Sequence, residues 1–369
     1  MILAYKYRLY PTSGQHARLK AALEHSRQLY NAALEERLDC YRKTGKGRSF
    51  YDQCKALAQL RQDTGSPYAS TMERAPLRAL DKAYKAFFKR GGFPRFKGRE
   101  RFRSIEWVER SGWDLRQGKF WAKGIGAIRV KLHRLLPEAI KAARVKREGR
   151  HWFVVLTAEV EPRQGEDRPP VGVDMGLASL AALSTGETFA NPRAYRRALK
   201  RLRVKQRALA RCRRGSARRR KVRSALALTH LKIRRIRETN LHTLSADLTR
   251  RFGLVAVEAL NVKGLANSRL AKDVRDAGWR RLRELLRYKA ELNGGQLVEV
   301  DPRYTSQTCP GCGVVSAKTL SDRVHECPCG CVLDRDVAAA KVVLHRAVRG
   351  LEALNVAGNG ERAPGKVAA

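Results

Sequence analysis

The chain has 369 residues and carries 77 Lys and Arg against 35 Asp and Glu, a formal net charge of +42. A compact protein with that charge repels itself unless it works beside a polyanion, so nucleic acid is the expected partner. Apolar residues make up 43% of the chain, too many for a disordered basic tail. No apolar run reaches the roughly 20 residues of a membrane span, and the N-terminus lacks the apolar core of a signal peptide. We therefore expect a cytoplasmic protein that lies on the nucleoid when it binds DNA, and exclude membrane and secreted proteins.

The first part of the chain has the pattern of a small β-domain with a helical insertion. Residues 1–12 alternate like a strand, residues 13–90 have apolar side chains at helical spacing, and short strands separated by turns fill 113–162. We expect the first strand to pair with the later ones. Between them, the stretch 93–103 interleaves Phe with basic residues, and its Phe rings either stack on bases or pack the β-domain. The candidate nucleic-acid contacts in this stretch are Arg95 and Lys97.

The second part of the chain alternates strands with helices from Pro169 onward. A tail rich in Gly, Ala and Pro follows Gly350 and is expected to be loose. The predicted elements in chain order are strands VGVDMG and LASLAAL around Gly176, helices over 193–251 interrupted at Gly215–Ser216, a strand over 254–260, a helix over 276–293, a strand over 296–301 and a helix over 334–348.

One long stretch of this part has charge of a single sign. Residues 193–237 contain 20 Lys or Arg and no Asp or Glu. A solvated helix face normally mixes signs, so we expect this stretch to contact nucleic-acid phosphates. The candidate contacts nearest its interruption are Arg211, Arg213, Arg214, Arg218, Arg219 and Arg220.

Three acidic residues stand in apolar surroundings. Asp174 lies in the strand VGVDMG, Glu258 ends the strand LVAVE, and Asp336 is in the first turn of the last predicted helix. A buried charge is costly unless something compensates it, and a shared divalent cation would do so. RNase H-like nucleases build a two-Mg²⁺ site for phosphodiester hydrolysis from carboxylates in this same order: an Asp in one strand, a Glu in a later strand and an Asp in a helix. Two alternatives stay open: Glu258 is solvated or ion-paired, or Asp334 is the ligand and Asp336 an ordinary N-cap residue.

Five of the eight cysteines crowd into one short stretch near the C-terminus, which is typical of a metal site and not of a disulfide scaffold. Cys309-Pro-Gly-Cys312-Gly has the spacing of a zinc knuckle. The second half, Cys327-Pro-Cys329-Gly-Cys331, is one residue shorter than a standard knuckle. Cys327 is a candidate ligand, and the fourth is Cys329, which we favour, if the next Gly marks the turn, or Cys331 if the turn is looser. We expect one structural Zn²⁺; free thiols on a loop are the alternative.

Nine segments share the residues and the order of a known family. They are YKYRLYPT (5–12), SRQLYNAAL (26–34), DKAYKAFFKR (81–90), GFPRFKGR (92–99), VGVDMG (171–176), VAVEALNVKGL (255–265), DAGWRRLRELLRYKA (276–290), DPRYTSQTCPGCG (301–313) and LDRDVAAAK (333–341). Together they resemble the TnpB family, RNA-guided nucleases that bacterial insertion sequences encode and that are regarded as ancestral to type V CRISPR effectors.

The resemblance implies a multidomain α/β fold. Its expected parts are a wedge domain, an oligonucleotide-binding-like β-barrel, at 1–12 and 91–165; an inserted helical recognition domain at 13–90; a RuvC, RNase H-like nuclease domain at 166–301 and 332–350; an inserted zinc ribbon at 302–331; and the tail at 351–369.

The resemblance also implies an activity. TnpB-like proteins act as monomers on one guide RNA transcribed from their own element, recognise a short transposon-adjacent motif, and cut guide-matched double-stranded DNA. By motif, Asp174, Glu258 and Asp336 match the Mg²⁺-binding RuvC carboxylates, and Cys309, Cys312 and Cys327 match zinc ligands. The shortened second knuckle departs from the family and leaves the fourth zinc ligand open. Ala338 replaces an Asn that is usual in the family. The alternatives are a nuclease-weak RNA-guided DNA-binding repressor and an RNA-independent RNase H-like transposase.

Overall fold

The computed structural model describes residues 1–265, 267–268, 270–319 and 322–359. The chain forms two compact units, Met1–Val160 and the part from Glu161 onward. Within the described residues, no helix is both long and apolar enough to cross a membrane.

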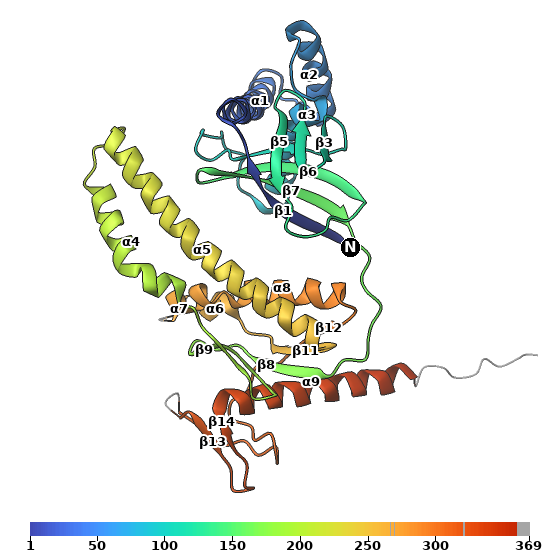
Figure 1. Cartoon of the computed structure of the whole chain (residues 1–369), viewed down its shortest axis with the longest axis vertical. Coiled ribbons are helices and arrows are strands. Elements are labelled where there is room, and N and C mark those ends of the chain that lie inside the picture. The colour runs from blue at the N-terminus through green and yellow to red at the C-terminus, as the bar shows by residue number, and fades with distance from the viewer. Residues whose placement is uncertain (266, 269, 320–321, 360–369) are drawn as a thin grey trace, which may run out of the picture. The chain divides into compact units, whose positions relative to one another are not determined.

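The first unit is built on a seven-stranded antiparallel sheet with its N-terminal strand in the middle (Figure 1). Strand β1 (Ile2–Tyr10) pairs with β7 on one side and with β5 on the other. The predicted pairing of the first strand with the later ones is thereby confirmed. The sheet order is β2-β6-β7-β1-β5-β4-β3, and the strands are β2 (Ser104–Trp107), β3 (Trp113–Arg116), β4 (Lys119–Ala122), β5 (Gly126–Lys131), β6 (Ile140–Glu148) and β7 (His151–Glu159).

Three helices lie between β1 and β2, where the sequence predicted a helical insertion. The first begins with a capping box, in which the side chains of Thr12 and Gln15 each accept a hydrogen bond from the other's backbone N–H. The second begins with the same device, formed by Ser49 and Asp52. The helices are α1 (Ser13–Thr44), α2 (Phe50–Thr64) and α3 (Ser70–Arg90).

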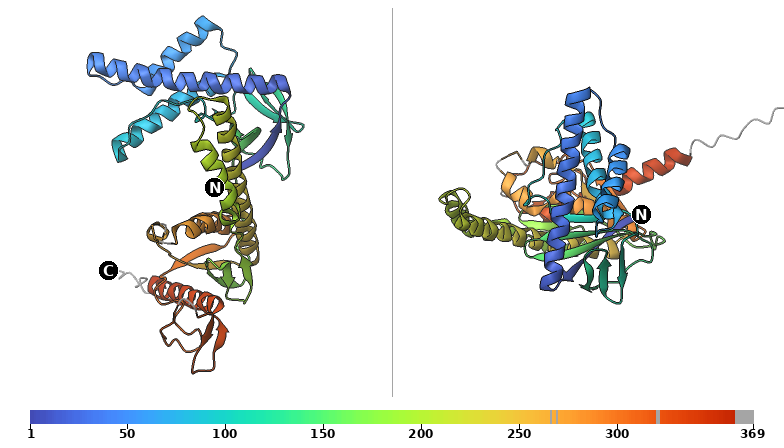
Figure 2. Two further views of the ribbon diagram at one scale, coloured as in Figure 1. Left: turned by 90° about the vertical axis from the view of Figure 1, so that its left-hand side faces the viewer. Right: turned by 90° about the horizontal axis from the view of Figure 1, so that it is seen from above.

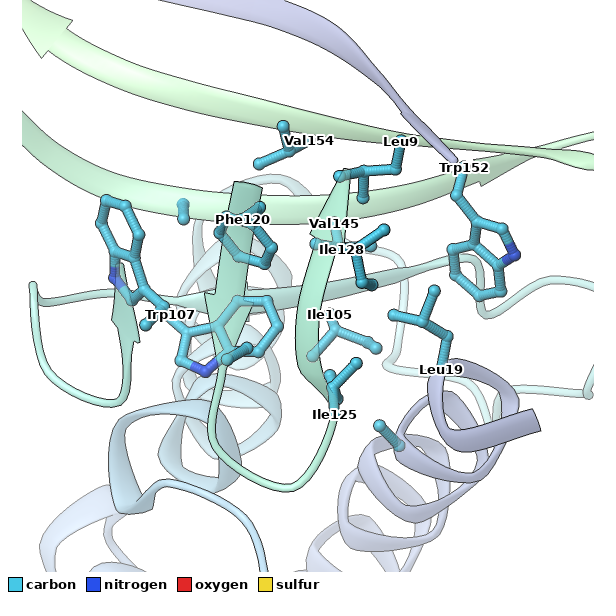
Figure 3. Close-up of a cluster of buried hydrophobic side chains, with 14 of the residues drawn as sticks. Leu9, Leu19, Ile105, Trp107, Phe120, Ile125, Ile128, Val145, Trp152 and Val154 are labelled. Atoms are coloured by element: carbon cyan, nitrogen blue, oxygen red, sulfur yellow. The ribbon is translucent and has the colours of Figure 1, made fainter. Parts of the chain in front are cut away.

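The core of the first unit is formed by alternate residues of the strands (Figure 3). Trp107 and Phe120 meet edge to face with their ring centroids 5.7 Å apart, and both are fully buried. Leu19 of α1 closes the core from the helical side. Because side chains alternate along a strand, the intervening residues of the same strands face outward.

The second unit contains a five-stranded sheet in the order β10-β9-β8-β11-β12. The first three strands are antiparallel, whereas β11 runs parallel to both β8 and β12. Strands β8 and β11 are apolar at nearly every position before their last residue, because both faces of the sheet are covered there. The strands are β8 (Pro170–Asp174), β9 (Ser179–Leu183), β10 (Thr188–Ala190), β11 (Leu254–Glu258) and β12 (Gln296–Val300).

Helices pack on both faces of this sheet. One face packs against α5 and α8 through Val173 and Val257, and the other packs against α9 through Ala256 and Val300. Gly172 of β8 allows close packing of α9, because a Cβ there would lie 2.0 Å from the carbonyl oxygen of Ala340. The remaining elements are α4 (Ala194–Ala210), α5 (Ala217–Arg251), α6 (Val262–Leu265), α7 (Ala271–Ala277), α8 (Trp279–Leu292), β13 (Val324–Glu326), β14 (Val332–Asp334) and α9 (Arg335–Asn359).

Two helix predictions need correction. The helix expected over 276–293 is two helices, because Gly278 has a φ of +75° and its backbone N–H closes the end of α7 on the carbonyl of Val274. The tail expected to be loose after Gly350 continues α9 as far as Asn359, since its first residues include the good helix formers Leu, Glu and Ala. Residues 360–369 lie outside the described part of the chain.

Candidate functional site

The sheet of the second unit brings the three predicted carboxylates together. Asp174 and Glu258 are the last residues of β8 and β11, which are neighbours in parallel. Parallel strands end at the same edge of a sheet, so both carboxylates lie at that edge. Asp336 joins them from the first turn of α9, which packs along β8. The carboxylates are therefore placed by three elements that are distant in the sequence.

Burial and like charge dominate the electrostatics of this cluster. Burial, with further contributions from the negative charges of Glu258 and Asp336, raises the pKa of Asp174 from 3.8 to about 8. Burial also raises the pKa of Glu258, whose side chain is only 7% exposed, and that of Asp336, which lies beside Asp334. An unpaired cluster of this kind disfavours the ionised carboxylates, and a cation of high charge would reverse that preference.

The roles of the two aspartates at the start of α9 are distinct. Asp334 Oδ1 accepts hydrogen bonds from the backbone N–H groups of Asp336, at 2.9 Å, and Val337, at 3.2 Å. It is therefore the residue that caps the helix. The capping bond involves only the backbone N–H of Asp336. The carboxylate of Asp336 is therefore not used in capping, and its negative charge acts on Asp174.

The spacing of the carboxylates differs from that of the cysteine cluster. Within the described residues, the groups of three or more ligand atoms that lie within 4.8 Å of one another all belong to the cysteine stretch. The oxygens of Asp174, Glu258 and Asp336 are therefore not all within 4.8 Å of one another in this structure.

Sequence reasoning missed Thr305, which contacts this cluster directly. Its hydroxyl donates to Glu258 Oε1 and also lies 3.0 Å from the carbonyl oxygen of Pro302. Thr305 is 3% exposed, and its hydrogen bond opposes the rise that burial imposes on the pKa of Glu258. A threonine in a loop gives no signal in the sequence, because its partner lies 47 residues away along the chain.

The cysteine stretch forms a second candidate metal centre. The sulfurs of Cys309, Cys312, Cys327 and Cys329 all lie within 4.8 Å of one another. Two pairs are closest, Cys309 with Cys329 at 3.6 Å and Cys312 with Cys327 at 3.5 Å. This set is the one favoured from the knuckle spacing. Cys331 is not part of it and belongs to a second group with Cys309 and another residue.

That other residue is His325, which sequence reasoning also missed. It is fully buried in β13, and a His two residues before Cys327 is a spacing that could have marked it. Burial alone would raise the pKa of the Cys309 thiol, but hydrogen bonds from the backbone N–H of Cys312 and from His325 bring it down to about 5. Cys309 is thus held as the thiolate, which is the form that binds a metal. Burial and hydrogen bonds among the sulfurs instead raise the pKa of Cys327 to about 12 and that of Cys329 above its usual value, and a bound cation would reverse that preference.

The predicted basic residues lie on two separate segments. Helices α4 and α5 form a hairpin (Figures 1 and 2), joined through Ala198, Leu202 and Ile233 on their facing sides. Five of the six named arginines at its tip are exposed. The exception is Arg219, whose guanidinium donates to the carbonyls of Leu209 and Cys212 and so closes the end of α4.

The second basic segment joins α3 to β2. Arg95 is exposed, whereas Lys97 is held by Asn31, whose Oδ1 accepts from its backbone N–H at 2.8 Å. Phe93 and Phe96 are 45% and 52% exposed. They therefore do not fill the core of the β-domain, which was the alternative to base stacking.

The chain combines two candidate metal centres, one of carboxylates and one of thiolates, with exposed arginines at the tip of the α4–α5 hairpin. These are the features of a nucleic-acid-processing enzyme. Family profiles match three parts of the chain: a "helix-turn-helix domain" over residues 1–46, a "probable transposase" over 153–269 and a "Cas12f1-like, TNB domain" over 279–343. In the structure, residues 1–46 form β1 and the single long helix α1.

Curated relatives extend over nearly the whole chain. A putative RNA-guided DNA endonuclease of Streptomyces pristinaespiralis is 36% identical over an alignment 356 residues long that covers 92% of this chain and 88% of that protein. The putative RNA-guided DNA endonuclease InsQ of Escherichia coli K12 is 26% identical over 84% of this chain and 83% of its own. The chain belongs to the TnpB family.

Solved structures resemble the chain more remotely. A Cas12f1–sgRNA–target DNA complex has 15% identity and a TM-score of 0.37 over 93% of this chain and 99% of that chain. A mini-RNA-guided endonuclease, CRISPR-Cas_phi3, has 10% identity and a TM-score of 0.44 over 94% and 92%.

Proposed function

We propose that this protein is an RNA-guided DNA endonuclease of a transposable element, in which Asp174, Glu258 and Asp336 bind two Mg²⁺ ions. The observation that carries the proposal is the buried carboxylate cluster. In this cluster three acidic side chains lie together, and nearby arginines do not offset the rise that burial imposes on their pKa values. Ionising such buried carboxylates is costly unless a cation binds them. The names of the curated relatives support the activity.

The sheet of the second unit supports a RuvC-type, RNase H-like domain. Its order, three antiparallel strands followed by two parallel ones, is the order of that fold, and its first and fourth strands in sequence end in carboxylates. When bound, the two cations would activate the attacking water and stabilise the leaving oxygen. The protein supplies the anionic oxygens at fixed positions, and Thr305 orients Glu258 through its hydroxyl.

The same proposal assigns the remaining parts. Cys309, Cys312, Cys327 and Cys329 hold one structural Zn²⁺ in a ribbon at 302–331, inserted between the nuclease segments 166–301 and 332–350. The wedge at 1–12 and 91–165 takes in the sheet of the first unit and the five residues that follow that unit, and the recognition helices are at 13–90. The exposed arginines of the α4–α5 hairpin support contact with phosphates of guide RNA or target DNA. The protein acts as a monomer on one RNA, in the bacterial cytoplasm.

The test uses protein co-expressed with RNA from the end of its own gene. The complex is incubated with Mg²⁺ and a plasmid that carries the guide-matched target beside a randomised flank, with Asp174→Ala as the control. Cutting at a subset of flanks, absent in the control and after RNase treatment, is the expected result and reveals the transposon-adjacent motif. Flank-specific binding without cutting by the wild-type protein refutes the nuclease and directs attention to Ala338. Cutting that survives RNase refutes RNA guidance.

A further inference from the structure

The outer face of the first unit's sheet is hollowed where β3, β4 and β5 meet. The hollow has a volume of about 860 Å³, and its lining includes Arg110, Trp113, Arg116, Lys119, Trp121 and Ala127. None of these residues belongs to the carboxylate site or to the cysteine cluster.

Trp121 faces into solvent at this hollow. Along β4, Phe120 points into the core (Figure 3), so Trp121 points to the opposite side and remains 45% exposed. Its cross-strand neighbours are Asp114 on β3 and Ala127 on β5. Because Ala127 carries only a methyl group, it leaves the indole uncovered on that side. Exposing a large ring in this way gains nothing for folding, since Trp121 is not part of the buried core.

Positive charge surrounds the indole. Lys119 lies two residues before Trp121 on the same face, directly opposite Arg116 on one neighbouring strand and Arg129 on the other. Among the described residues that line the hollow, the one acid is Asp114, and it forms an ion pair with Arg116. The surface around Trp121 therefore keeps a net positive charge.

A second ring continues the same surface on β1. Tyr10 pairs with Arg129 in the register of β1 and β5, so it lies on the outward face in line with Lys119. The guanidinium carbons of Arg8 and Arg129 lie 4.9 Å and 5.4 Å from the centre of its ring. Aromatic faces alternating with cations suit a chain of flat rings joined by phosphates, which is a single strand of nucleic acid.

We infer that Trp121, with Tyr10 beside it, is a stacking platform for unpaired nucleotides of the RNA that the protein carries. This inference rests on the proposed function. RNA is the better candidate than target DNA because the RNA is the resident strand, whereas DNA arrives as a duplex whose bases are already stacked on each other. Stacking on the indole needs a free base face, and the surrounding cations bind the adjoining phosphates.

The experiment uses the full-length protein and RNA transcribed from the end of its own gene. The RNA carries photoreactive 4-thiouridine in place of uridine, and crosslinked peptides are identified by mass spectrometry. RNA affinity is measured for the wild type, Trp121→Ala and Trp121→Phe. Trp121→Phe is the matched control, because it keeps an aromatic face at the same position on β4.

We expect a crosslink in the peptide that contains Trp121, and an RNA affinity that falls roughly 5- to 100-fold in Trp121→Ala, as for the loss of one stacked base. Trp121→Phe keeps most of the affinity. The variants should also melt at the same temperature as the wild type, which shows that the loss of affinity is not a folding defect.

Other results overturn the inference and separate it from the proposed function. If the wild type binds RNA and cuts its target, but Trp121→Ala binds RNA equally well, only the platform is wrong. If the Trp121 crosslink forms with labelled target DNA and not with RNA, the strand assignment is wrong. If the wild type binds no RNA, both the platform and the proposed function fail.

Discussion

Replacing Asp174 with Asn should make the metal-free protein more stable at neutral pH than the wild type. In the folded chain the pKa of Asp174 is about 8, against an ordinary value of 3.8, because the carboxyl is buried beside Glu258 and Asp336. Between these two values the folded state holds a proton that the unfolded state has lost. Stability therefore falls as the pH rises through this window, and it is unaffected by this group below the unfolded pKa. Asn has the same shape and no proton to lose.

The magnitude follows from the size of the pKa shift. Each pH unit inside the window costs the wild type about 1.4 kcal/mol, so the stability difference between Asp174→Asn and the wild type should grow by about 3 kcal/mol from pH 5 to pH 7.5. Hydrogen exchange of the β8 amides in EDTA measures the free energy of opening at this strand. Mg²⁺ should remove the pH dependence of the difference, because it binds the ionised carboxylate of the wild type.

A matched control is Glu284→Gln, an equivalent replacement at an exposed position on α8. It should change the free energy of opening at β8 little, because Glu284 is exposed and is not part of the carboxylate cluster. The refuting result is a free energy of opening that changes with pH in Asp174→Asn just as it does in the wild type. Asp174 would then not be a buried carboxyl in a cluster of like charge, and the reasoning behind the metal site would be wrong.

Three further changes test other parts of the structure. Thr305→Val should lower the affinity for Mn²⁺, measured by electron paramagnetic resonance, by roughly 10- to 100-fold, because Glu258 loses its orienting hydrogen bond. Cys309→Ser should abolish the zinc content of the purified protein and speed hydrogen exchange over residues 302–331, because metal binding and folding of the ribbon are coupled. Gly172→Ala should destabilise the second unit by about 1–3 kcal/mol in urea unfolding, because the added Cβ meets the carbonyl of Ala340.

Each of these changes has a control within the chain. Thr305→Ser keeps the hydroxyl and should retain Mn²⁺ affinity; equal affinity in the Val variant would contradict the role given to Thr305. Cys212→Ser removes a thiol outside the cluster and should leave the zinc content unchanged, whereas zinc retained in Cys309→Ser would exclude Cys309 as a ligand. Gly350 also lies on α9, but a Cβ added there meets no atom within 4 Å, so Gly350→Ala should not destabilise the protein.

Local patterns in the sequence were sufficient for most of the secondary structure. Alternation in the first strand, helical spacing between Ser13 and Arg90, and the apolar runs that end in Asp174 and Glu258 all correspond to elements of the structure. These features depend on residues a few positions apart, which the sequence displays directly. The break at Gly278 escaped this reasoning because the apolar period continues across it, and only its left-handed backbone separates α7 from α8.

The sequence by itself also predicted which residues form the two candidate centres, since carboxylates in apolar strands and cysteines at knuckle spacing are visible without a fold. Only the tertiary structure decided which residues meet. Thr305 reaches Glu258 across 47 residues, His325 turns its ring toward the thiols, and the pleat of β4 turns Trp121 outward beside Lys119. Such contacts depend on strand order, register and helix packing, and these are set by burial summed over the whole unit, so no short window of sequence specifies them.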